Sequence, residues 1–282
     1  PVFCMNIDTC VLSKKIEIFY WNINGVKNKF LSNDVTNMIH GKGLICLAET
    51  HFNIRTKCPT GFYLVDRSEP IASKKPRGGV AIYVNMKTNI KLKPLKMNLK
   101  DCVIAEIVDS NIIIAVMYLP PTNSLYYSDE YFDSLSVIFD TFGKSRSIVL
   151  IGDFNARIAN TFPKRKFHYK ENPDKIINQN GKKLINLLLN HPNMIIVNGL
   201  SCNNNLCDTE FTFHRGKNMS QNDLCITNDI SIVQKFIINN KKPQSDHSAC
   251  LLELKLKMNW PLDTLHDCAS GFMSLTHYDL NN

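Results

Sequence analysis

The sequence predicts an α/β fold, a four-layer α/β sandwich in which two mixed β-sheets pack face to face and helices cover their outer faces. The 282 residues are enough for one large core. More than ten short apolar runs, rich in β-branched residues, alternate with polar turns, whereas only two or three segments have helical periodicity. Because one open twisted sheet rarely exceeds about ten strands, two packed sheets are the better fit.

The expected strands are recognised by apolar runs that end in turn residues. They cover residues 16–20, 44–48, 79–84, 102–108, 111–118, 148–151, 194–197, 210–213, 224–227, 230–238 and 249–256. Several of these runs are apolar at every position, as expected of strands buried on both faces.

The clearest helix is expected over residues 129–142. Ser128 can cap its first turn and Gly143 follows its end. Its apolar residues lie on one face: Phe132, Leu135, Ile138, Phe139 and Phe142. A second helix is expected to start at Asn180-Gly181, and a third to end near Gly41.

The domain organisation is expected to be simple. Residues 1–15 look like an N-terminal extension or linker, residues 16–257 form one folded domain, and residues 258–282 look like a tail or linker. No apolar run approaches the ~20 residues that a membrane span needs, and no secretory leader is recognisable. Because the first residue is proline, we expect a piece of a longer polypeptide.

Charge and cysteine content narrow the function only slightly. The net charge of +8 mildly favours a polyanionic partner, although a solvated lysine-rich surface is the more ordinary explanation of the charge taken alone. The ten cysteines are irregularly spaced, and several stand inside apolar strands. This pattern is typical of buried free thiols in a reducing compartment.

Polar side chains cluster where four of the apolar runs end or begin. The clusters are Asn22-Ile23-Asn24-Gly25, Glu49-Thr50-His51, Gly152-Asp153-Phe154-Asn155 and Ser245-Asp246-His247. Strand ends are rigid supports that face the open rim of a sheet, so they can hold a metal and a substrate.

Each of these residues alone also has a purely structural interpretation. Glu49 fits a loop carboxylate and Tyr118 an ordinary strand-end aromatic. Asp153 and Asp223 fit turn residues, and His247 fits a hydrogen-bonded core histidine. Their joint occurrence, in this order, favours one catalytic site.

The motifs together resemble a known superfamily. They are Trp21-Asn22-Ile23-Asn24-Gly25, Leu47-Ala48-Glu49-Thr50-His51, Gly78-Gly79-Val80-Ala81-Ile82, Tyr118-Leu119-Pro120-Pro121, Gly152-Asp153-Phe154-Asn155-Ala156, Asp223-Leu224 and Ser245-Asp246-His247-Ser248. This set resembles the endonuclease/exonuclease/phosphatase superfamily and, more narrowly, the apurinic-type endonuclease domain of non-LTR retrotransposons. The resemblance covers residues 16–256 and implies a deoxyribonuclease I-like sandwich with a catalytic domain over residues 16–257.

The resemblance also implies a divalent metal site. Glu49 would hold Mg²⁺, or Mn²⁺, with Asn22 nearby and with Asp246 completing or steadying the site. Hard oxygen ligands suit such an ion.

The remaining catalytic roles follow from the same resemblance. Asp153 would orient or deprotonate the attacking water, and Asn155 would position that water or the phosphate. His247 would donate to the phosphate, while Asp223 would fix the His247 tautomer. Tyr118 would contact the phosphate or the leaving oxygen.

Four further residues are expected to contact DNA: Asn24, Arg77, Thr122 and Thr212. The sequence departs from the superfamily pattern at Pro121, where many relatives have Asn. An amide near the scissile phosphate is therefore missing, and Thr122 or Asn123 are the candidates to replace it.

The expected activity is metal-dependent nicking of double-stranded DNA that leaves a 5′-phosphate and a 3′-hydroxyl. In a retrotransposon this hydroxyl would prime reverse transcription, so a fused or cooperating reverse transcriptase is expected, with a monomeric domain acting inside the cell, in the nucleus. Apurinic-site repair is the nearest alternative, and a non-catalytic DNA-binding relic is a further one. Deadenylation and lipid-phosphate hydrolysis fit less well, because their distinctive insertions are not apparent.

Overall fold

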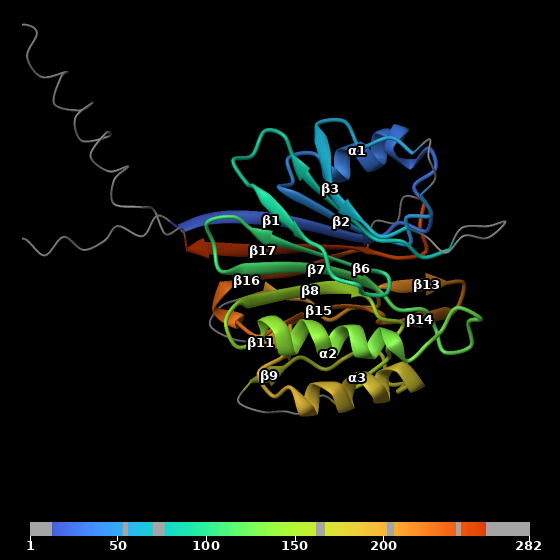
Figure 1. The fold of residues 1–282 in the computed structure, drawn as a ribbon. Helices are drawn as coiled ribbons and strands as arrows, with labels where there is room; N and C mark the ends of the chain where they lie inside the picture. Colours follow the sequence, from blue (N-terminus) through green and yellow to red (C-terminus); the bar gives the residue numbers. More distant parts are fainter. Residues whose placement is uncertain are drawn as a thin grey trace, which may run out of the picture.

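Two large β-sheets pack face to face and helices lie on both outer faces, so the molecule has four layers (Figure 1). The computed structural model describes residues 13–52, 56–69, 77–161, 167–201, 206–240 and 244–257. This arrangement confirms the predicted α/β sandwich.

The first sheet has seven strands and the second has six. The seven-stranded sheet runs in the order β12 (Leu206–Cys207), β16 (Val233–Asn239), β17 (Ala249–Lys257), β1 (Ser13–Asn22), β2 (Leu44–Ala48), β4 (Ala81–Asn85) and β3 (Phe62–Arg67). The six-stranded sheet runs in the order β10 (Ile195–Ile196), β15 (Asp223–Thr227), β8 (Ser147–Asp153), β7 (Ile112–Tyr118), β6 (Cys102–Ile107) and β5 (Leu92–Leu95). Two small ribbons complete the β-structure: β9 (His168–Tyr169) with β11 (Leu200–Ser201), and β13 (Phe213–Arg215) with β14 (Asn218–Ser220).

Strand β7 shows why the central strands are apolar at every position. Ile112, Ile114 and Val116 point into the core between the sheets, while Ile113 and Met117 point to the helices. Successive side chains of a strand face opposite sides, so a central strand in four layers meets apolar surroundings on both sides.

The helices divide between the two outer faces. Helices α2 (Glu130–Phe142) and α3 (Gln179–Asn190) cover the six-stranded sheet, while η1 (Lys29–Leu31) and α1 (Asn33–Ile39) cover part of the seven-stranded sheet (Figure 1). A short 3₁₀ turn, η2 (Ile230–Ile232), leads into β16. Helix α2 begins one residue later than expected: its N-cap is Asp129, which makes no side-chain cap hydrogen bond, and Ser128 Oγ instead accepts from Glu130 N at 3.2 Å in the turn before the helix.

Most predicted elements match the structure, and the mismatches lie at edges and ends. The edge strands β3 and β5 were not predicted, because β3 is half-exposed along most of its length and β5 contains Pro94. The strand expected over residues 210–213 was placed too early, since β13 starts only at Phe213. Strand β1 starts at Ser13, inside the expected extension, because Ser13 to Lys15 pair with β17 although they lack an apolar pattern.

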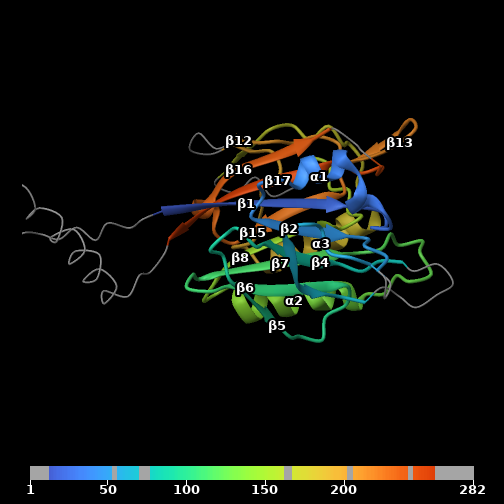
Figure 2. The ribbon, with the colours of Figure 1, turned by 90° about the horizontal axis from the view of Figure 1, so that it is seen from above.

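The first and last described strands lie side by side. Ser13 pairs with Lys257, and the opposite end of β1 carries the polar residue Asn22 (Figures 1 and 2). Among the described residues no helix is long and apolar enough to cross a membrane. Of the cysteines that the structure describes, Cys58 is exposed and the others are buried.

Gly152 is required by the close approach of two parallel strands. It pairs with Met117, and a Cβ built on Gly152 would lie 2.2 Å from the Met117 carbonyl oxygen. The glycine of the Gly-Asp-Phe-Asn motif therefore sets the distance between β7 and β8, and with it the place of Asp153.

Replacing Gly152 with Ala should lower the free energy of unfolding by about 1–3 kcal/mol, the usual cost of overpacking a core. Urea unfolding followed by circular dichroism would measure this loss. Gly216→Ala is the matched control, because a Cβ there meets nothing within 4 Å and only the positive φ of 61° opposes it. A smaller loss at Gly152 than at Gly216 would contradict the packing argument.

Candidate active site

Strand ends from both sheets bring the predicted catalytic residues together. Asn22 ends β1, and Glu49 directly follows the parallel neighbour β2. Asp153 ends β8 in the facing sheet, where its register partners are Tyr118 on β7 and Asp223 on β15. Glu49 from the seven-stranded sheet and Asp153 and Asp223 from the six-stranded sheet therefore lie at the same rim.

The side-chain amide of Asn22 joins the two sheets. Its Nδ2 donates to Glu49 Oε1 at 2.9 Å and to Asp153 Oδ2 at 2.7 Å, while its Oδ1 accepts from Asn24 N at 3.1 Å. Because Asn22 is fully buried, both hydrogen bonds are shielded from water. One residue therefore fixes the spacing of the two carboxylates.

Glu49 is held in a specific conformation. Its φ of 47° lies in the left-handed region, which costs free energy for a residue other than glycine. His51 Nε2 lies 3.3 Å from Glu49 Oε2. Burial alone would raise the pKa of Glu49, but hydrogen bonds from His51 and Asn22 outweigh it and lower that pKa. Glu49 is therefore a carboxylate at neutral pH.

Asp153 is the most electrostatically strained group of the site. It is 1% exposed, and Asn155 N donates to its Oδ1 at 2.9 Å. Desolvation, followed by the charge of Asp223, raises the pKa of Asp153 to about 7, although the charge of His247 opposes this. A buried carboxyl group of this kind can take up a proton near neutral pH.

His247 and Asp223 form a buried pair. The imidazole Nδ1 lies 2.8 Å from Asp223 Oδ2, and Nε2 lies 3.8 Å from Asp153 Oδ2. Burial would lower the pKa of His247, but the charge and hydrogen bond of Asp223 raise it to about 10. His247 is therefore an imidazolium at neutral pH and presents Nε2–H as a donor.

Two aromatic residues of β1 support this pair. Tyr20 donates from its hydroxyl to Asp223 Oδ1 at 2.8 Å, and Trp21 Nε1 donates to the His247 carbonyl oxygen at 3.0 Å. Ser245 Oγ accepts from His247 N at 3.1 Å and donates to the Asn22 carbonyl at 2.8 Å. The backbone of His247 is thus tied directly to β1.

Asn155 lies on the opposite side of Asp153, with a φ of 44°. Its Nδ2 donates to the Leu119 carbonyl at 2.9 Å, and its Oδ1 accepts from Asn222 Nδ2 at 3.5 Å. Tyr118 precedes Leu119, and burial, reinforced by the charge of Glu49, raises the pKa of its hydroxyl. Tyr118 therefore stays protonated and can donate a hydrogen bond.

A second ion pair, between Arg157 and Asp174, supports the loop that precedes Asp223. Arg157 Nε and Nη2 donate to Asp174 Oδ2 and Oδ1 at 2.8 and 2.7 Å, and the Asp174 side chain is fully buried. Asp174 Oδ2 also accepts from Gln221 N at 3.1 Å. The loop that carries Asn222 is thereby anchored next to Asp223.

The donor set fits a divalent metal ion. Within the described part of the chain, the ligand atoms of Glu49, Asp153 and His247 lie within 4.8 Å of one another. Glu49 and Asp153 offer the hard oxygens that such an ion prefers, whereas an imidazolium donates rather than coordinates. Asn22 would offer an oxygen after rotation of its amide, because the amide nitrogen faces both carboxylates here.

Some predicted residues lie elsewhere than expected. Asp246 is outside the three-residue group, and its Oδ1 accepts from Asn24 Nδ2 at 3.2 Å on the half-exposed rim. Thr212, expected to contact DNA, is fully buried, and its hydroxyl accepts from Asn222 N and Asp223 N, both at 3.0 Å. Thr212 therefore positions the chain around Asp223, an arrangement that an isolated threonine in the sequence does not reveal.

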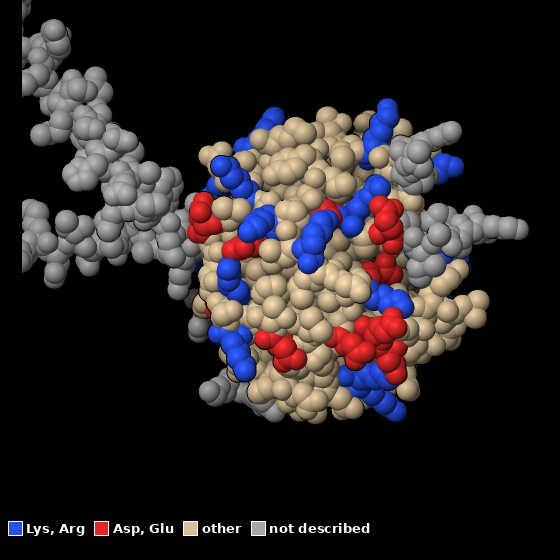
Figure 3. All heavy atoms as spheres, viewed as in Figure 1, with Lys and Arg blue, Asp and Glu red and all other residues tan. Residues whose placement is uncertain are grey.

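The other predicted DNA contacts are exposed. All three lie at the surface: Asn24 follows β1, Thr122 follows β7 and Arg77 precedes β4. On the face drawn in Figure 3, basic and acidic side chains are interspersed and do not form one continuous basic surface. This face alone therefore does not mark a DNA-binding surface by its charge.

Several supporting residues were not assigned a role from the sequence. Tyr20 was hidden in an apolar run, although a tyrosine that points inward usually needs a hydrogen-bond partner. His51, Trp21 and Ser245 stand inside the motifs, but their contacts depend on tertiary structure.

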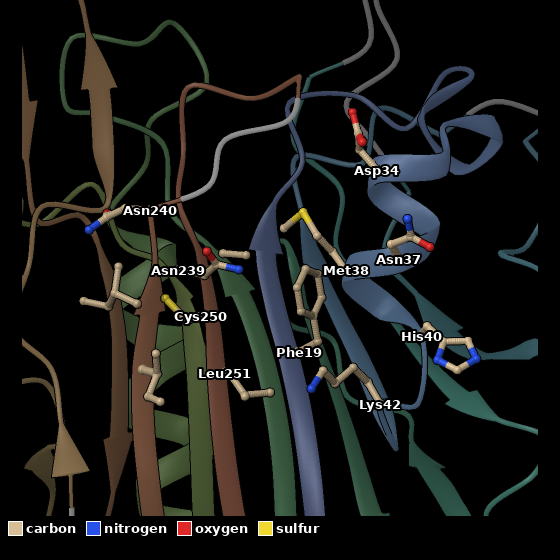
Figure 4. A pocket seen from close by; sticks show the side chains of 13 residues that line it. Phe19, Asp34, Asn37, Met38, His40, Lys42, Asn239, Asn240, Cys250 and Leu251 are labelled. Atoms are coloured by element: carbon tan, nitrogen blue, oxygen red, sulfur yellow. The ribbon is translucent and has the colours of Figure 1, made fainter.

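A separate groove lies behind the site, on the outer face of the seven-stranded sheet. It measures about 910 Å³ and separates α1 from β16 and β17 (Figure 4). Phe19 and Met38 lie between the helix and the strands, and Asn239 and Asn240 come from the opposite side. None of the residues lining this groove belongs to the catalytic cluster.

A family model described as "Endonuclease-reverse transcriptase" matches residues 112–251. This stretch contains Tyr118, Asp153, Asp223 and His247. No curated protein matches the chain.

Solved structures with the same fold include three informative relatives. The endonuclease domain of TRAS1, a telomere-specific non-LTR retrotransposon, superposes with a TM-score of 0.62 at 13% identity, over 86% of this chain and 100% of that one. The 3′-5′ exonuclease NExo from Neisseria meningitidis gives 0.57 at 15% identity, over 87% and 100%. The 3′ phosphatase NExo from Neisseria, bound to a product DNA hairpin, gives 0.55 at 14% identity, over 87% and 100%.

Fold, site and family model agree on one class, a nuclease built on two packed sheets with its acidic residues at the strand ends. Residues 112–251 match the endonuclease-reverse transcriptase family model, and the whole described fold is that of these nuclease structures.

The raised pKa of Asp153 predicts a pH-dependent stability in metal-free protein. Its carboxyl group binds its proton more tightly folded than unfolded, so stability falls as pH rises from about 4 to about 7. Asp153→Asn removes this loss. The melting temperature of Asp153→Asn minus that of the wild type should therefore increase from about pH 4 to about pH 7. Each pKa unit by which folding raises the pKa of Asp153 corresponds to about 1.4 kcal/mol.

Differential scanning calorimetry in EDTA would measure the two melting temperatures at each pH. Asp133→Asn, at an exposed carboxylate of α2, is the control for the substitution itself. If the two melting temperatures differ by the same amount at every pH from 4 to 7, the raised pKa of Asp153 is refuted.

Proposed function

We propose that this protein is a Mg²⁺-dependent DNA endonuclease that nicks one strand and leaves a 3′-hydroxyl and a 5′-phosphate. The observation that carries the proposal is the convergence of Asn22, Glu49 and Asp153 opposite the His247–Asp223 pair. Phosphodiester hydrolysis needs an aligned water, neutralised charge on the phosphate and a stabilised leaving oxygen. This site has groups for all three.

Asp153 would orient the attacking water and accept its proton, since its raised pKa suits a base near neutral pH. Asn155, fixed by the Leu119 carbonyl, would position the water or a phosphate oxygen. His247 would donate its Nε2 proton to the developing charge on the phosphate, and Tyr118 would donate to the phosphate or the leaving oxygen.

Glu49 would hold the metal, with Asn22 as the neighbouring amide and Asp246 completing or steadying the site, which leaves Asp153 to act as the base. A bound Mg²⁺ or Mn²⁺ neutralises charge on a non-bridging phosphate oxygen. Asp223 keeps His247 protonated and oriented, and Tyr20 in turn holds Asp223.

We infer that the biological role is to open target DNA for reverse transcription by a non-LTR retrotransposon. The endonuclease-reverse transcriptase family model and the shared fold of the TRAS1 domain support this role. It implies action on double-stranded DNA in the nucleus, by a monomeric domain fused to or acting with a reverse transcriptase. Apurinic-site repair remains the second candidate because the same site chemistry serves both.

Supercoiled plasmid should be nicked in the presence of Mg²⁺, and EDTA should abolish nicking. Asp153→Ala and His247→Ala should each reduce the rate about a hundredfold or more, the typical cost of losing one such group. Gel electrophoresis of the relaxed circle would give the rates. Unchanged nicking by both variants would disprove the site.

Glu49→Gln tests the metal side and has a matched control. Glu171 is an exposed glutamate with 77% of its side chain accessible, paired with Lys175. Glu171→Gln should cut like the wild type, while Glu49→Gln should require far more Mg²⁺, because it removes a charged ligand.

The choice between the two roles needs two duplexes of the same sequence, one intact and one with a single abasic site. Comparable cleavage of both duplexes supports target nicking. Strong preference for the abasic duplex supports repair, and sequencing of the nick positions would then define the target.

A further inference from the structure

A buried carboxylate outside the catalytic cluster, Asp101, stands at the junction of three elements. It directly precedes β6, it is 8% exposed, and its φ of 38° lies in the left-handed region. Burial raises the pKa of Asp101, although hydrogen bonds from Gly79, Tyr131 and Ser68 oppose this. A carboxylate held at such a cost, in a strained backbone, calls for an explanation beyond packing.

The carboxylate of Asp101 accepts hydrogen bonds from three separate segments. Oδ1 accepts from Gly79 N at 3.2 Å and from Ser68 Oγ at 3.4 Å, and Oδ2 accepts from Tyr131 OH at 3.1 Å. Gly79 precedes β4, Ser68 follows β3, and Tyr131 belongs to α2. Asp101 therefore connects the edge of the seven-stranded sheet to a helix that covers the other sheet.

The turn at Gly78 and Gly79 fits closely around this carboxylate. A Cβ on Gly78 would lie 2.8 Å from Asp101 Oδ2, and Gly78 has a φ of 68°. The same turn also holds the backbone of the two residues that follow Glu49. The carbonyl of Gly79 accepts from Thr50 N at 3.0 Å, and that of Gly78 accepts from His51 N at 3.2 Å.

A second connection leads from Asp101 to the other side of the site. The backbone carbonyl of Asp101 accepts from Tyr118 N at 3.0 Å. Asp101 thus touches the supports of Glu49, through the glycine turn, and of Tyr118, through the backbone. It contacts neither of these side chains through its own carboxylate.

We propose that Asp101 is a positioning residue that sets the place of Glu49, through the Gly78–Gly79 turn, and so sets the affinity of the site for its divalent metal. This inference rests on the proposed metal-dependent nuclease function. Residues that hold a metal ligand in place without touching the metal typically change the metal affinity by about 10–100-fold when they are removed.

Asp101→Asn is the direct test. An amide keeps the size of the side chain but offers one acceptor oxygen where the carboxylate uses two, and its NH₂ group faces donors. Mn²⁺ affinity without DNA, measured by isothermal titration calorimetry, should fall about tenfold. The Mg²⁺ concentration for half-maximal nicking should rise equally, while the KM for DNA stays close to that of the wild type.

Tyr131→Phe separates positioning from stability. It removes one donor to Asp101 but leaves the contact with Gly79, so it should lower the melting temperature and leave Mn²⁺ affinity near that of the wild type. If Asp101→Asn also loses only stability and binds Mn²⁺ like the wild type, the proposal is overturned.

Gly78→Ala serves if Asp101→Asn fails to fold. It displaces the turn while the carboxylate stays in place, and it should weaken Mn²⁺ binding. Gly61→Ala is its control, with a similar φ of 82° and nothing within 4 Å of the added Cβ. Equal Mn²⁺ affinity of these two variants would refute the proposal.

The result can be separated from the nuclease proposal. If the wild type binds Mn²⁺ but does not nick DNA, the proposed function fails, and the affinity comparison still tests the role of Asp101. If the wild type nicks DNA and Asp101→Asn keeps full Mn²⁺ affinity, only the positioning role fails.

Discussion

The site depends on the bond pair made by the Asn22 amide, which donates to a carboxylate from each sheet. Two packed sheets are held apart by their apolar side chains, so polar groups at their rims meet only where strand ends converge. The Asn22 side chain connects the two sheets here, because it donates to both Glu49 and Asp153. A second link joins the same two sheets: Tyr20 on β1 of the seven-stranded sheet donates to Asp223 on β15 of the six-stranded sheet, and Asp223 also binds His247. The rim is therefore the place where both sheets act as one support.

Bringing three carboxylates together has an electrostatic cost, and the structure offsets it unequally. Asp223 is neutralised by His247 and accepts from Tyr20, and Glu49 accepts from Asn22 and His51. Asp153 has only uncharged donors at hydrogen-bond distance, so its pKa rises. This imbalance leaves the group at the centre of the site ready to take a proton or to accept a cation. Charge that the fold leaves uncompensated is available for binding and chemistry.

The sequence predicted the parts of this molecule that are set by local pattern, and missed those set by distant partners. Apolar runs identified the central strands, and the polar residues next to their ends identified Asn22, Glu49 and Asp153, which follow strands, and His247, which precedes one. Thr212 was assigned from motif position alone, and its full burial excludes the expected contact with DNA, whereas the role of Asp246 stays a prediction. Asp101 carries no motif, because its role arises from a strained turn and from donors more than 20 residues away. Edge strands β3 and β5 were missed since half-exposed strands lack a clean pattern.

The proline that replaces the usual asparagine after Tyr118-Leu119-Pro120 fits the same logic. Pro121 has no N–H to contribute, but the segment before it does not rely on one. Asn155 donates to the Leu119 carbonyl, and Asn180 donates to the Pro120 carbonyl at 3.1 Å and to the Phe154 carbonyl at 3.2 Å. Two carboxamides thus fix this segment to the Gly-Asp-Phe-Asn loop from outside. The Leu119 and Pro120 carbonyls are thus held by side chains outside the Tyr118-Leu119-Pro120-Pro121 motif, and none of these contacts requires an N–H at residue 121.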